Sequence, residues 1–310
     1  MDVIKGSEKI PTHLQGAFVT IGNFDGVHLG HQYIFRHLIE EAHAVGRPAV
    51  VISFEPHPKM VLHPERRPFY LITSLEEKIR LLERIGIDAL LLIPFTLEYA
   101  RTTAEQFVRQ VLGERLRIGK ILIGHDYTFG RNKEGNEAFL IAAGKRWGFE
   151  VEVMNAFRID EMTVSSTQIR EAILAGKVRF AASLLGRPYN LAGEVVTGHR
   201  RGVRLGFPTA NIRPDKELIP AGGIYAAFVL FEGNRYGGVL NIGVNPTFED
   251  RKLSIEVYIF DFHETIYGKT LDLLFIERIR DEVRFESPEK LIAQIDRDIA
   301  RARKILKSEK

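Results

Sequence analysis

The sequence predicts an α/β protein of two parts, with a parallel β-sheet in the N-terminal part and an antiparallel β-barrel, followed by a helix, in the C-terminal part. Up to about residue 153, short apolar runs alternate with segments of helical periodicity, which is typical of parallel strands covered by helices on both faces. After about residue 184, Gly and Pro separate short strand-like runs, a pattern that favours an antiparallel barrel or sandwich. The length of 310 residues fits two domains.

Five runs predict the strands of the sheet, namely residues 17–21, 49–54, 89–93, 120–123 and, as a weaker fifth, 150–153. Two helix starts between them carry capping signals. Ser74 with Glu77 and Thr103 with Gln106 have the spacing of a capping box, in which side chains satisfy the free backbone N–H groups of the first turn.

The C-terminal part predicts strands at residues 224–230, 236–240 and 253–260. A last helix is expected from Ser287, with Pro288 in the first helical position. The predicted domains are residues 1–184 and 185–310, joined near residues 185–189.

Composition excludes several classes of protein. With 45% hydrophobic and 27% charged residues the chain can bury a core, and it shows neither a membrane-length apolar run nor a signal peptide. We therefore expect a cytoplasmic protein. Zero cysteines leave only oxygen and imidazole ligands for a metal, so Mg²⁺ is the expected cofactor. Lys plus Arg number 43 and Asp plus Glu 40, a net charge of +3 that suits anionic small substrates and nucleic acid about equally.

The segment 21–31 leaves the first predicted strand and enters a helix expected to begin near Gln32. Backbone can approach a ligand at its three glycines, Gly22, Gly26 and Gly30, and a helix start offers N–H groups to an anion. His28 and His31 could donate to phosphate oxygens as charge grows on a leaving pyrophosphate. The alternative is a glycine-rich connection with two ordinary surface histidines.

A second phosphate-binding element is predicted at residues 165–170, where Ser165, Ser166 and Thr167 precede Arg170. Hydroxyls, backbone N–H groups and a guanidinium at a helix start all suit phosphate. The alternative is a plain capping box made by Ser165 and Gln168.

Two loops follow predicted strands between these elements, at residues 54–58 and 124–130. Both lie at the carboxyl ends of parallel strands, where open α/β sheets bind their ligands. Loops bounded by Pro or Gly could equally be simple turns.

The C-terminal part has a constellation of its own at residues 193–211. Gly198 and Gly202 bracket a basic loop able to fold over phosphates, and Thr209 and Asn211 offer neutral oxygens to Mg²⁺. Glu256 lies in an otherwise apolar strand, where it could accept a hydroxyl proton. The alternatives are a solvated surface turn and a solvent-facing glutamate.

The N-terminal motifs resemble the adenylyltransferase module of bifunctional bacterial riboflavin kinase/FAD synthetases, which belong to the HxGH nucleotidyltransferases and have a Rossmann-like sheet. The match rests on residues 22–31, 54–58 and 165–170. It implies an ATP site made by Gly22, Phe24, Gly26, His28, Gly30, His31, Ser165, Ser166, Thr167 and Arg170. It also implies that FMN binds near Pro56, His57, Pro58 and Asp126.

The C-terminal motifs resemble the riboflavin kinase module of the same family. The match rests on residues 206–211, 241–248, Glu256 and 267–269. It implies that Thr209 and Asn211 bind Mg²⁺ and ATP together with Gly198 and Gly202, that Glu256 is the base, and that Arg280 closes the flavin site. The chain departs from the family pattern at Val203, Arg204 and Asn245.

The resemblance implies an enzyme that phosphorylates riboflavin to FMN in its C-terminal domain and adenylylates FMN to FAD in its N-terminal domain. Its partners are then ATP, riboflavin and FMN, with neither nucleic acid nor membrane, and its oligomeric state is left open. Two alternatives are a nucleotidyltransferase with another acceptor and a basic protein that binds nucleic acid.

Overall fold

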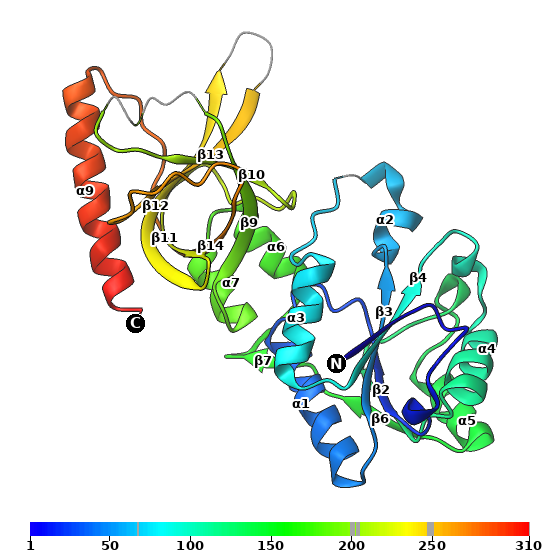
Figure 1. The fold of residues 1–310 in the computed structure, drawn as a ribbon. Coiled ribbons are helices and arrows are strands. Elements are labelled where there is room, and N and C mark those ends of the chain that lie inside the picture. Colours follow the sequence, from blue (N-terminus) through cyan, green and yellow to red (C-terminus); the bar gives the residue numbers. More distant parts are fainter. Residues whose placement is uncertain (67, 199–201, 203–204, 247–250, 310) are drawn as a thin grey trace. The chain divides into compact units, whose positions relative to one another are not determined.

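Two compact units make up the computed structural model, which describes residues 1–66, 68–198, 202, 205–246 and 251–309 (Figure 1). Unit 1 comprises residues 1–69 and 73–165, and unit 2 comprises residues 70–72 and 166–310. Residues 166–184, which the sequence predicts to belong to the first domain, pack within unit 2. The domain boundary at 184/185 stays a prediction of the sequence.

A six-stranded parallel sheet forms the centre of unit 1 in the part of the chain that the structure describes, in the order β1-β4-β3-β2-β5-β6. The strands are β1 Asp2–Lys5, β2 Phe18–Ile21, β3 Ala49–Glu55, β4 Ala89–Pro94, β5 Lys120–Gly124 and β6 Glu150–Met154. The five predicted strands are confirmed. The sequence missed β1, a four-residue strand on the edge of the sheet that runs parallel to β4.

Helices cover both faces of this sheet. On one face lie α1 Leu29–Ala44 and α3 Leu75–Ile85, and on the other lie α4 Ala104–Phe107, the π-helix η4 Val108–Arg115 and α5 Glu137–Trp147. The short helix α2 Pro58–Leu62 follows the carboxyl end of β3 and buries no residue. Unit 1 also has the short hairpin β7 Arg158–Ile159 and β8 Met162–Thr163, and 3₁₀ turns at Thr12–Leu14, Pro64–Arg66, Tyr99–Arg101 and Arg131–Lys133.

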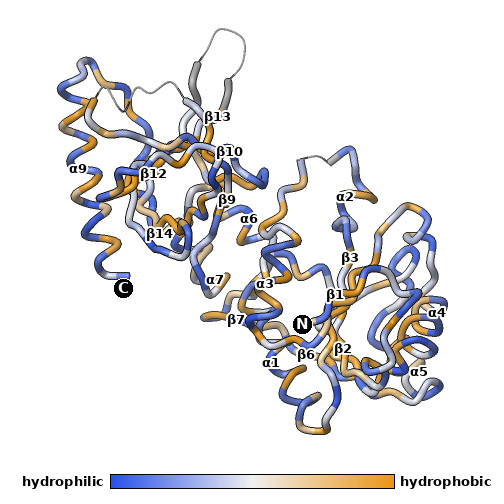
Figure 2. Tube along the Cα trace, viewed as in Figure 1, coloured by the Kyte–Doolittle hydropathy of each residue, from blue (hydrophilic) through white to orange (hydrophobic). Residues whose placement is uncertain are grey.

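The side chains of β3 alternate between two hydrophobic cores. Val51 packs with α1 and α3 residues such as Phe35 and Leu82, whereas Val50 packs with η4 and α5 residues such as Leu112 and Leu140. The hydropathy-coloured trace shows the corresponding apolar strands in the middle of the unit (Figure 2). Because neighbouring side chains point to opposite faces, a strand covered on both sides reads as a continuous apolar run.

Helix caps agree largely with the sequence. Ser74 Oγ accepts from Glu77 N, and Thr103 with Gln106 forms the complete capping box. The helix expected near Gln32 begins earlier, at Leu29, because His28 serves as its N-cap.

A closed antiparallel barrel forms the centre of unit 2, in the order β10-β13-β12-β11-β14-β9, with β9 returning to β10. The strands are β9 Tyr189–Val196, β10 Ala210–Pro214, β11 Gly223–Phe231, β12 Asn234–Pro246, β13 Arg251–Ile259 and β14 Thr270–Arg280. The helices are α6 Ser166–Leu174, α7 Val178–Leu185 and α9 Pro288–Lys307. The predicted α/β sheet, barrel and terminal helix are therefore confirmed, and closure of the barrel excludes the sandwich.

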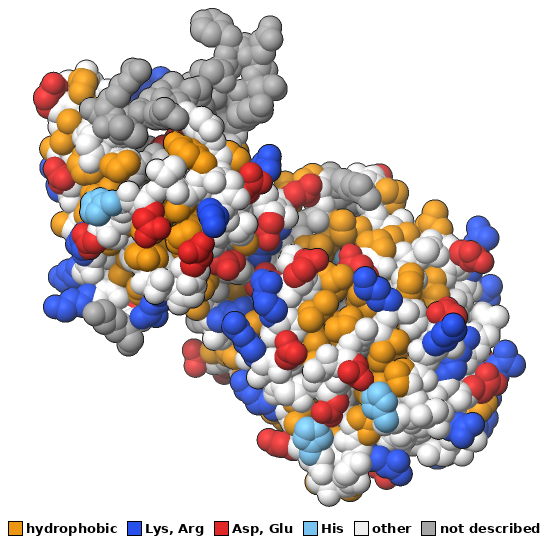
Figure 3. Space-filling view, viewed as in Figure 1, with side chains coloured by type: hydrophobic (Ala, Val, Ile, Leu, Met, Phe, Trp, Pro, Cys, Tyr) orange, Lys and Arg blue, Asp and Glu red, His pale blue; other side chains and the backbone are white. Residues whose placement is uncertain are grey.

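The terminal helix α9 begins as predicted, with the Ser287 side chain accepting from Lys290 N. Its apolar face packs on the outside of the barrel, where Ala302 and Leu306 join a core with Phe228 and Phe260. Among the described residues, no helix is both long and apolar enough to cross a bilayer. Acidic and basic side chains are interspersed on the face drawn in Figure 3.

Gly130 allows a close packing contact with Ala104, so we expect Gly130→Ala to destabilise unit 1 by at least about 2 kcal/mol. Its φ of 72° and ψ of 175° are a conformation that only glycine adopts without a cost of about 1–3 kcal/mol. A Cβ here would also lie 2.6 Å from Ala104 N. Urea unfolding followed by fluorescence of Trp147, the single tryptophan, measures the loss.

Gly46→Ala is the matched control in the same unit. Gly46 also has a positive φ, 66°, but a Cβ there would meet nothing within 4 Å. We expect a loss of about 1 kcal/mol, the backbone cost alone. Equal losses for the two variants would contradict the packing argument.

Candidate active sites

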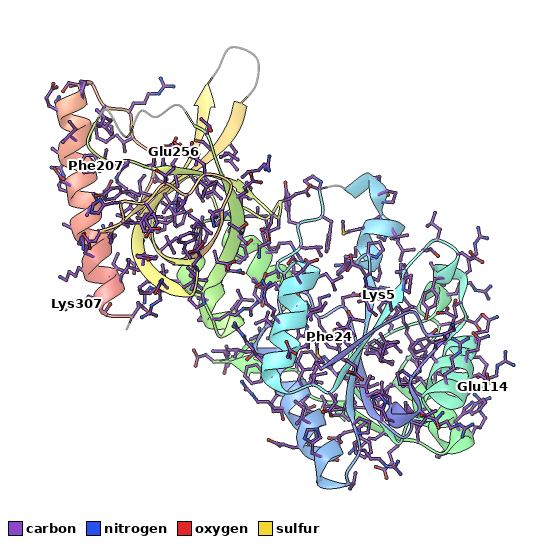
Figure 4. The ribbon with its side chains drawn as sticks, viewed as in Figure 1. Lys5, Phe24, Glu114, Phe207, Glu256 and Lys307 are labelled. Carbon is purple, nitrogen blue, oxygen red and sulfur yellow. The ribbon has the colours of Figure 1, made fainter. Side chains whose placement is uncertain are left out.

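The turn that leaves β2 has a backbone that few residues adopt. Phe24 and Val27 have positive φ values of 49° and 42°, and Gly26 has φ 88°. The Phe24 ring is 5% exposed and packs edge-on to Phe35 within unit 1 (Figure 4). A Cβ at Gly22 would lie 2.9 Å from this ring, so glycine there leaves room for Phe24.

His28 and His31 come together at the start of α1. His28 Nδ1 accepts from His31 N at 3.3 Å, and the two rings stack with centroids 3.5 Å apart. A Cβ at Gly30 would lie 3.2 Å from the His28 ring, and Phe24 meets His31 edge-on. The predicted residues of this element thus lie together at the turn after β2 and the start of α1. They are Gly22, Phe24, Gly26, His28, Gly30 and His31.

Burial holds the pKa of His31 well below its usual value, and positive charge on His28 and Lys78 lowers it further. His31 is therefore a neutral imidazole near pH 7. Its Nδ1 is buried and has no hydrogen-bond partner among the residues that the structure describes. A buried polar atom without a partner is costly, and such an atom at a helix start suits a ligand oxygen.

An aromatic cavity of about 790 Å³ lies at the carboxyl ends of the strands of unit 1 and includes Gly22 and Asn23 of the turn. Its aromatic lining consists of Phe54, Phe69, Phe95, Tyr99, Phe107, Tyr127 and Phe129. The Tyr99 hydroxyl is buried without a partner in the described part of the chain. A cavity of this size and character suits a flat, drug-sized ligand.

Of the four residues predicted to bind the flavin, only some lie at this cavity. Pro58 lines it, and the buried His57 ring lies 4.6 Å from that of Phe69, which also lines it. His57 is the N-cap of α2. Pro56 and Asp126 are exposed and are not among the lining residues. Their roles stay predictions.

The second predicted phosphate element straddles the division of the chain. Ser165 is the last residue of unit 1, whereas Ser166, Thr167 and Arg170 belong to unit 2 on α6. Arg170 Nε donates to Tyr70 O at 2.7 Å. The proximity of these residues to the histidines stays a prediction.

Glu256 lies in the middle of a row of polar residues across three strands of the barrel. Asn211 of β10 and Asn241 of β12 are its register partners on either side. Thr209 Oγ1 donates to Glu256 Oε2 at 3.1 Å. Asn241 Oδ1 is buried and has no partner among the described residues, which leaves an acceptor available beside the carboxylate.

The two glycines of the basic loop lie close to this row. A Cβ at Gly198 would lie 2.2 Å from Asn211 Nδ2, and one at Gly202 would lie 3.2 Å from Thr209 Oγ1. Gly198, Gly202, Thr209, Asn211 and Glu256 therefore come together as predicted. The basic residues 199–201 and the departures at 203 and 204 lie outside the described residues, as does the side chain of residue 245.

A second cavity, of about 440 Å³, lies between the outer face of the barrel and α9. Glu256, Thr209 and Asn241 line one side, and Leu291, Ile295 and Ile299 of α9 line another. Phe207 also lines it, near Glu256 at the same end of the barrel (Figure 4). The cavity thus combines apolar walls with a carboxylate.

Arg280, predicted to close the flavin site, lines this cavity but is held by Asp298 of α9. Arg280 Nη2 donates to Asp298 Oδ2 at 2.6 Å, and Nε lies 3.0 Å from each carboxylate oxygen. Gln294 Nε2 donates to the same carboxylate at 2.9 Å. Asp298 is 4% exposed, so this ion pair fastens α9 to the end of β14.

Sequence reasoning missed several residues of the two cavities. Phe95 and Tyr99 follow β4 and could have been found by applying the strand-end argument to every strand. Asn241 belongs to the motif at residues 241–248, on which the resemblance to the kinase module rests, but the resemblance assigns no role to Asn241. Nothing in the sequence distinguishes Asp298 from the other charged residues of α9, because only the fold places it against Arg280.

Two family models match the chain, FAD synthetase over residues 10–168 and riboflavin kinase over residues 185–306. The bifunctional riboflavin kinase/FMN adenylyltransferase of Haemophilus influenzae is 39% identical over 99% of this chain and 100% of its own length. The protein of the same name from Escherichia coli K12 is 36% identical over 98% and 97%. A crystal structure from Streptococcus pneumoniae, named a macrolide-efflux protein, is similar with TM-score 0.90 and 34% identity over 98% and 99% of the two chains.

We expect Asp298→Ala to destabilise unit 2 by about 3 kcal/mol, because removing one partner of a buried ion pair leaves the other charge uncompensated. Urea unfolding followed by far-UV circular dichroism measures the loss, with Trp147 fluorescence reporting unit 1 separately. Asp296→Ala, at an exposed position of the same helix, is the control and should change stability by less than about 0.5 kcal/mol. Similar losses at both positions would argue against the ion pair.

Proposed function

The chain belongs to the family of bifunctional riboflavin kinase/FMN adenylyltransferases, and on that premise we propose which of its residues carry out each reaction. The chain has both activities and produces FMN and FAD. ATP donates its γ-phosphoryl group in the first reaction and its adenylyl group in the second. The two cavities, each within one unit, support a separate site for each reaction.

Riboflavin phosphorylation belongs to the cavity of unit 2. A hydroxyl must lose its proton to attack the γ-phosphorus, and three carboxylates line this cavity, those of Glu256, Glu282 and Asp298. Asp298 is paired with Arg280, whereas Glu256 is the one that accepts from Thr209 and lies between two asparagines of the neighbouring strands. We assign Glu256 as the base that accepts the proton of the 5′-hydroxyl. The apolar walls supplied by α9 and the barrel suit the isoalloxazine ring. Arg280, oriented by Asp298, forms part of the wall.

The donor set around Glu256 fits Mg²⁺. Thr209 Oγ1 and the Asn211 side-chain oxygen are hard, neutral ligands on one side of Glu256, and Asn241, whose Oδ1 has no partner among the described residues, is the register partner of Glu256 on the other side. Among the described residues, no three His, Asp or Glu side chains form a metal cage, but Mg²⁺ often takes one or two protein oxygens together with substrate phosphates. When bound, the ion offsets charge on the ATP phosphates.

Adenylyl transfer belongs to the turn and cavity of unit 1. FMN already carries an anionic phosphate, so its oxygen can attack the α-phosphorus of ATP without a base. The remaining requirement is to stabilise charge on the leaving pyrophosphate. We assign this to His28 and His31 at the start of α1, while the phosphate-binding roles of Ser165, Ser166, Thr167 and Arg170 stay predictions of the sequence. The aromatic cavity beside Gly22 holds the isoalloxazine ring.

The single observation that supports this division best is the contrast between the sites. The hydroxyl acceptor is assigned to the site with a carboxylate beside Thr209. The phosphate acceptor is assigned to the site with stacked imidazoles at a helix start. Incubation with riboflavin, ATP and Mg²⁺, followed by separation of FMN from FAD, measures both reactions on one chain.

We expect Glu256→Gln to lower kcat for riboflavin phosphorylation at least about 100-fold, the usual scale for loss of a general base. FMN adenylylation by the same protein should stay within twofold, and this activity is the internal control for folding. A variant that phosphorylates riboflavin at the wild-type rate would show that Glu256 is not the base.

We expect His28→Ala with His31→Ala to have the opposite effect. Adenylylation of FMN should fall by about 100-fold or more, because removing one oxyanion donor costs about that much, while riboflavin phosphorylation is retained. Steady-state rates of FAD and FMN formation measure the two effects. A loss of less than about tenfold in FAD formation would contradict the assigned role of the imidazoles.

A further inference from the structure

Lys78 on α3 is a buried lysine that none of the motifs includes. It is 6% exposed, although lysine is almost never buried without a partner. Its ammonium donates to the carbonyl oxygen of Asn23 at 2.8 Å. Burial lowers the pKa of Lys78, while the negative charges of Asp25 and Glu55 oppose that shift. A methionine would fill the same volume at less cost, so packing alone does not account for this ammonium.

The segment leading into α3 holds the same turn at a second point. Thr73 N and Thr73 Oγ1 donate to Asp25 Oδ1 at 3.2 and 3.4 Å. Gly26 N donates to Thr73 Oγ1 at 3.1 Å. Lys78 therefore contacts Asn23, and Thr73 contacts Asp25 and Gly26, so that the turn is held on both sides of Phe24.

These contacts surround the strained part of the turn. Phe24, between Asn23 and Asp25, has a positive φ of 49°, which costs a non-glycine residue about 1–2 kcal/mol. Two residues beyond Gly26, the chain reaches His28. A change of conformation at 23–26 would consequently move the histidine pair.

We infer that Lys78 is a positioning residue for adenylyl transfer and that, with Thr73, it holds residues 23–26 in the conformation that places His28 and His31 on the phosphates. This inference rests on the role proposed above for the two histidines. Lys78 acts through the turn. Its ammonium also contributes to the lowered pKa of His31, which agrees with a location next to the reacting groups.

The test is Lys78→Met in the full chain. Displacement of catalytic groups by about 1 Å can cost on the order of 100-fold in rate, so we expect kcat for FMN adenylylation to fall by about 10- to 100-fold. The KM values for ATP and FMN should change by less than about threefold, because the aromatic side chains of the cavity belong to other segments than the turn. Riboflavin phosphorylation should stay within twofold, and Trp147 fluorescence should still show cooperative unfolding of unit 1.

Lys120→Met is the matched control. Lys120 is a paired lysine with Glu41 and Glu152 at 2.6 and 2.5 Å. It lies at the amino end of β5, whereas the turn follows the carboxyl end of β2. Its loss should leave kcat for both reactions within twofold, even where it lowers the stability of unit 1.

A double-mutant cycle separates positioning from an independent effect. If Lys78 acts through the histidines, adding Lys78→Met to His31→Ala should lower kcat for FMN adenylylation by less than about threefold further, because the effects of residues that act as a unit are not additive.

A second variant serves if Lys78→Met abolishes the unfolding transition of unit 1. Thr73→Val is then tested in place of Lys78→Met and should show the same loss of kcat at unchanged KM.

Two results would overturn the inference: wild-type kcat for FAD formation in the folded Lys78 or Thr73 variant, or losses that multiply in the cycle. Wild-type kcat in His31→Ala would instead overturn the proposed role of the histidines. The two failures are thus distinguishable.

Discussion

The anchoring of one strained turn determines the geometry of the site that we propose for adenylyl transfer. Residues 22–28 include two non-glycine residues with positive φ, Phe24 and Val27, and this backbone is costly in an isolated chain. It persists because the Phe24 ring is part of the hydrophobic core beneath α1. Relaxing the turn would remove that ring from its contacts. The imidazoles at the start of α1 are therefore in place before a substrate arrives, as electrostatic catalysis requires.

In the barrel, the register of the strands holds the candidate site residues in place. Strand register places Asn211 and Asn241 on either side of Glu256, and a slip of one residue would turn the glutamate to the opposite face of the sheet. Closure of the barrel leaves no free edge along which such a slip could begin. The helix α9, held to the barrel by the Arg280–Asp298 pair, then closes one side of the cavity.

The chemistry of the two acceptors explains why the sites that we propose for the two reactions differ. Riboflavin presents a hydroxyl, which must lose a proton, whereas FMN presents a phosphate that is already ionised at neutral pH. A carboxylate is needed where the acceptor is neutral. Near an anionic acceptor, a carboxylate would repel the substrate, and imidazole and helix N–H groups stabilise the developing charge without that cost.

The sequence by itself determined the fold class, five strands of the sheet and the terminal helix, because each depends on local periodicity, caps or a contiguous motif. It did not reveal β1, Lys78 or Asp298. Each of these owes its role to a neighbour distant in sequence: β1 to β4, Lys78 to Asn23, and Asp298 to Arg280. Only the tertiary structure decided that Lys78 and Asp298 are buried. The burial of a side chain depends on what the rest of the chain packs against it, and this leaves no pattern in the local sequence.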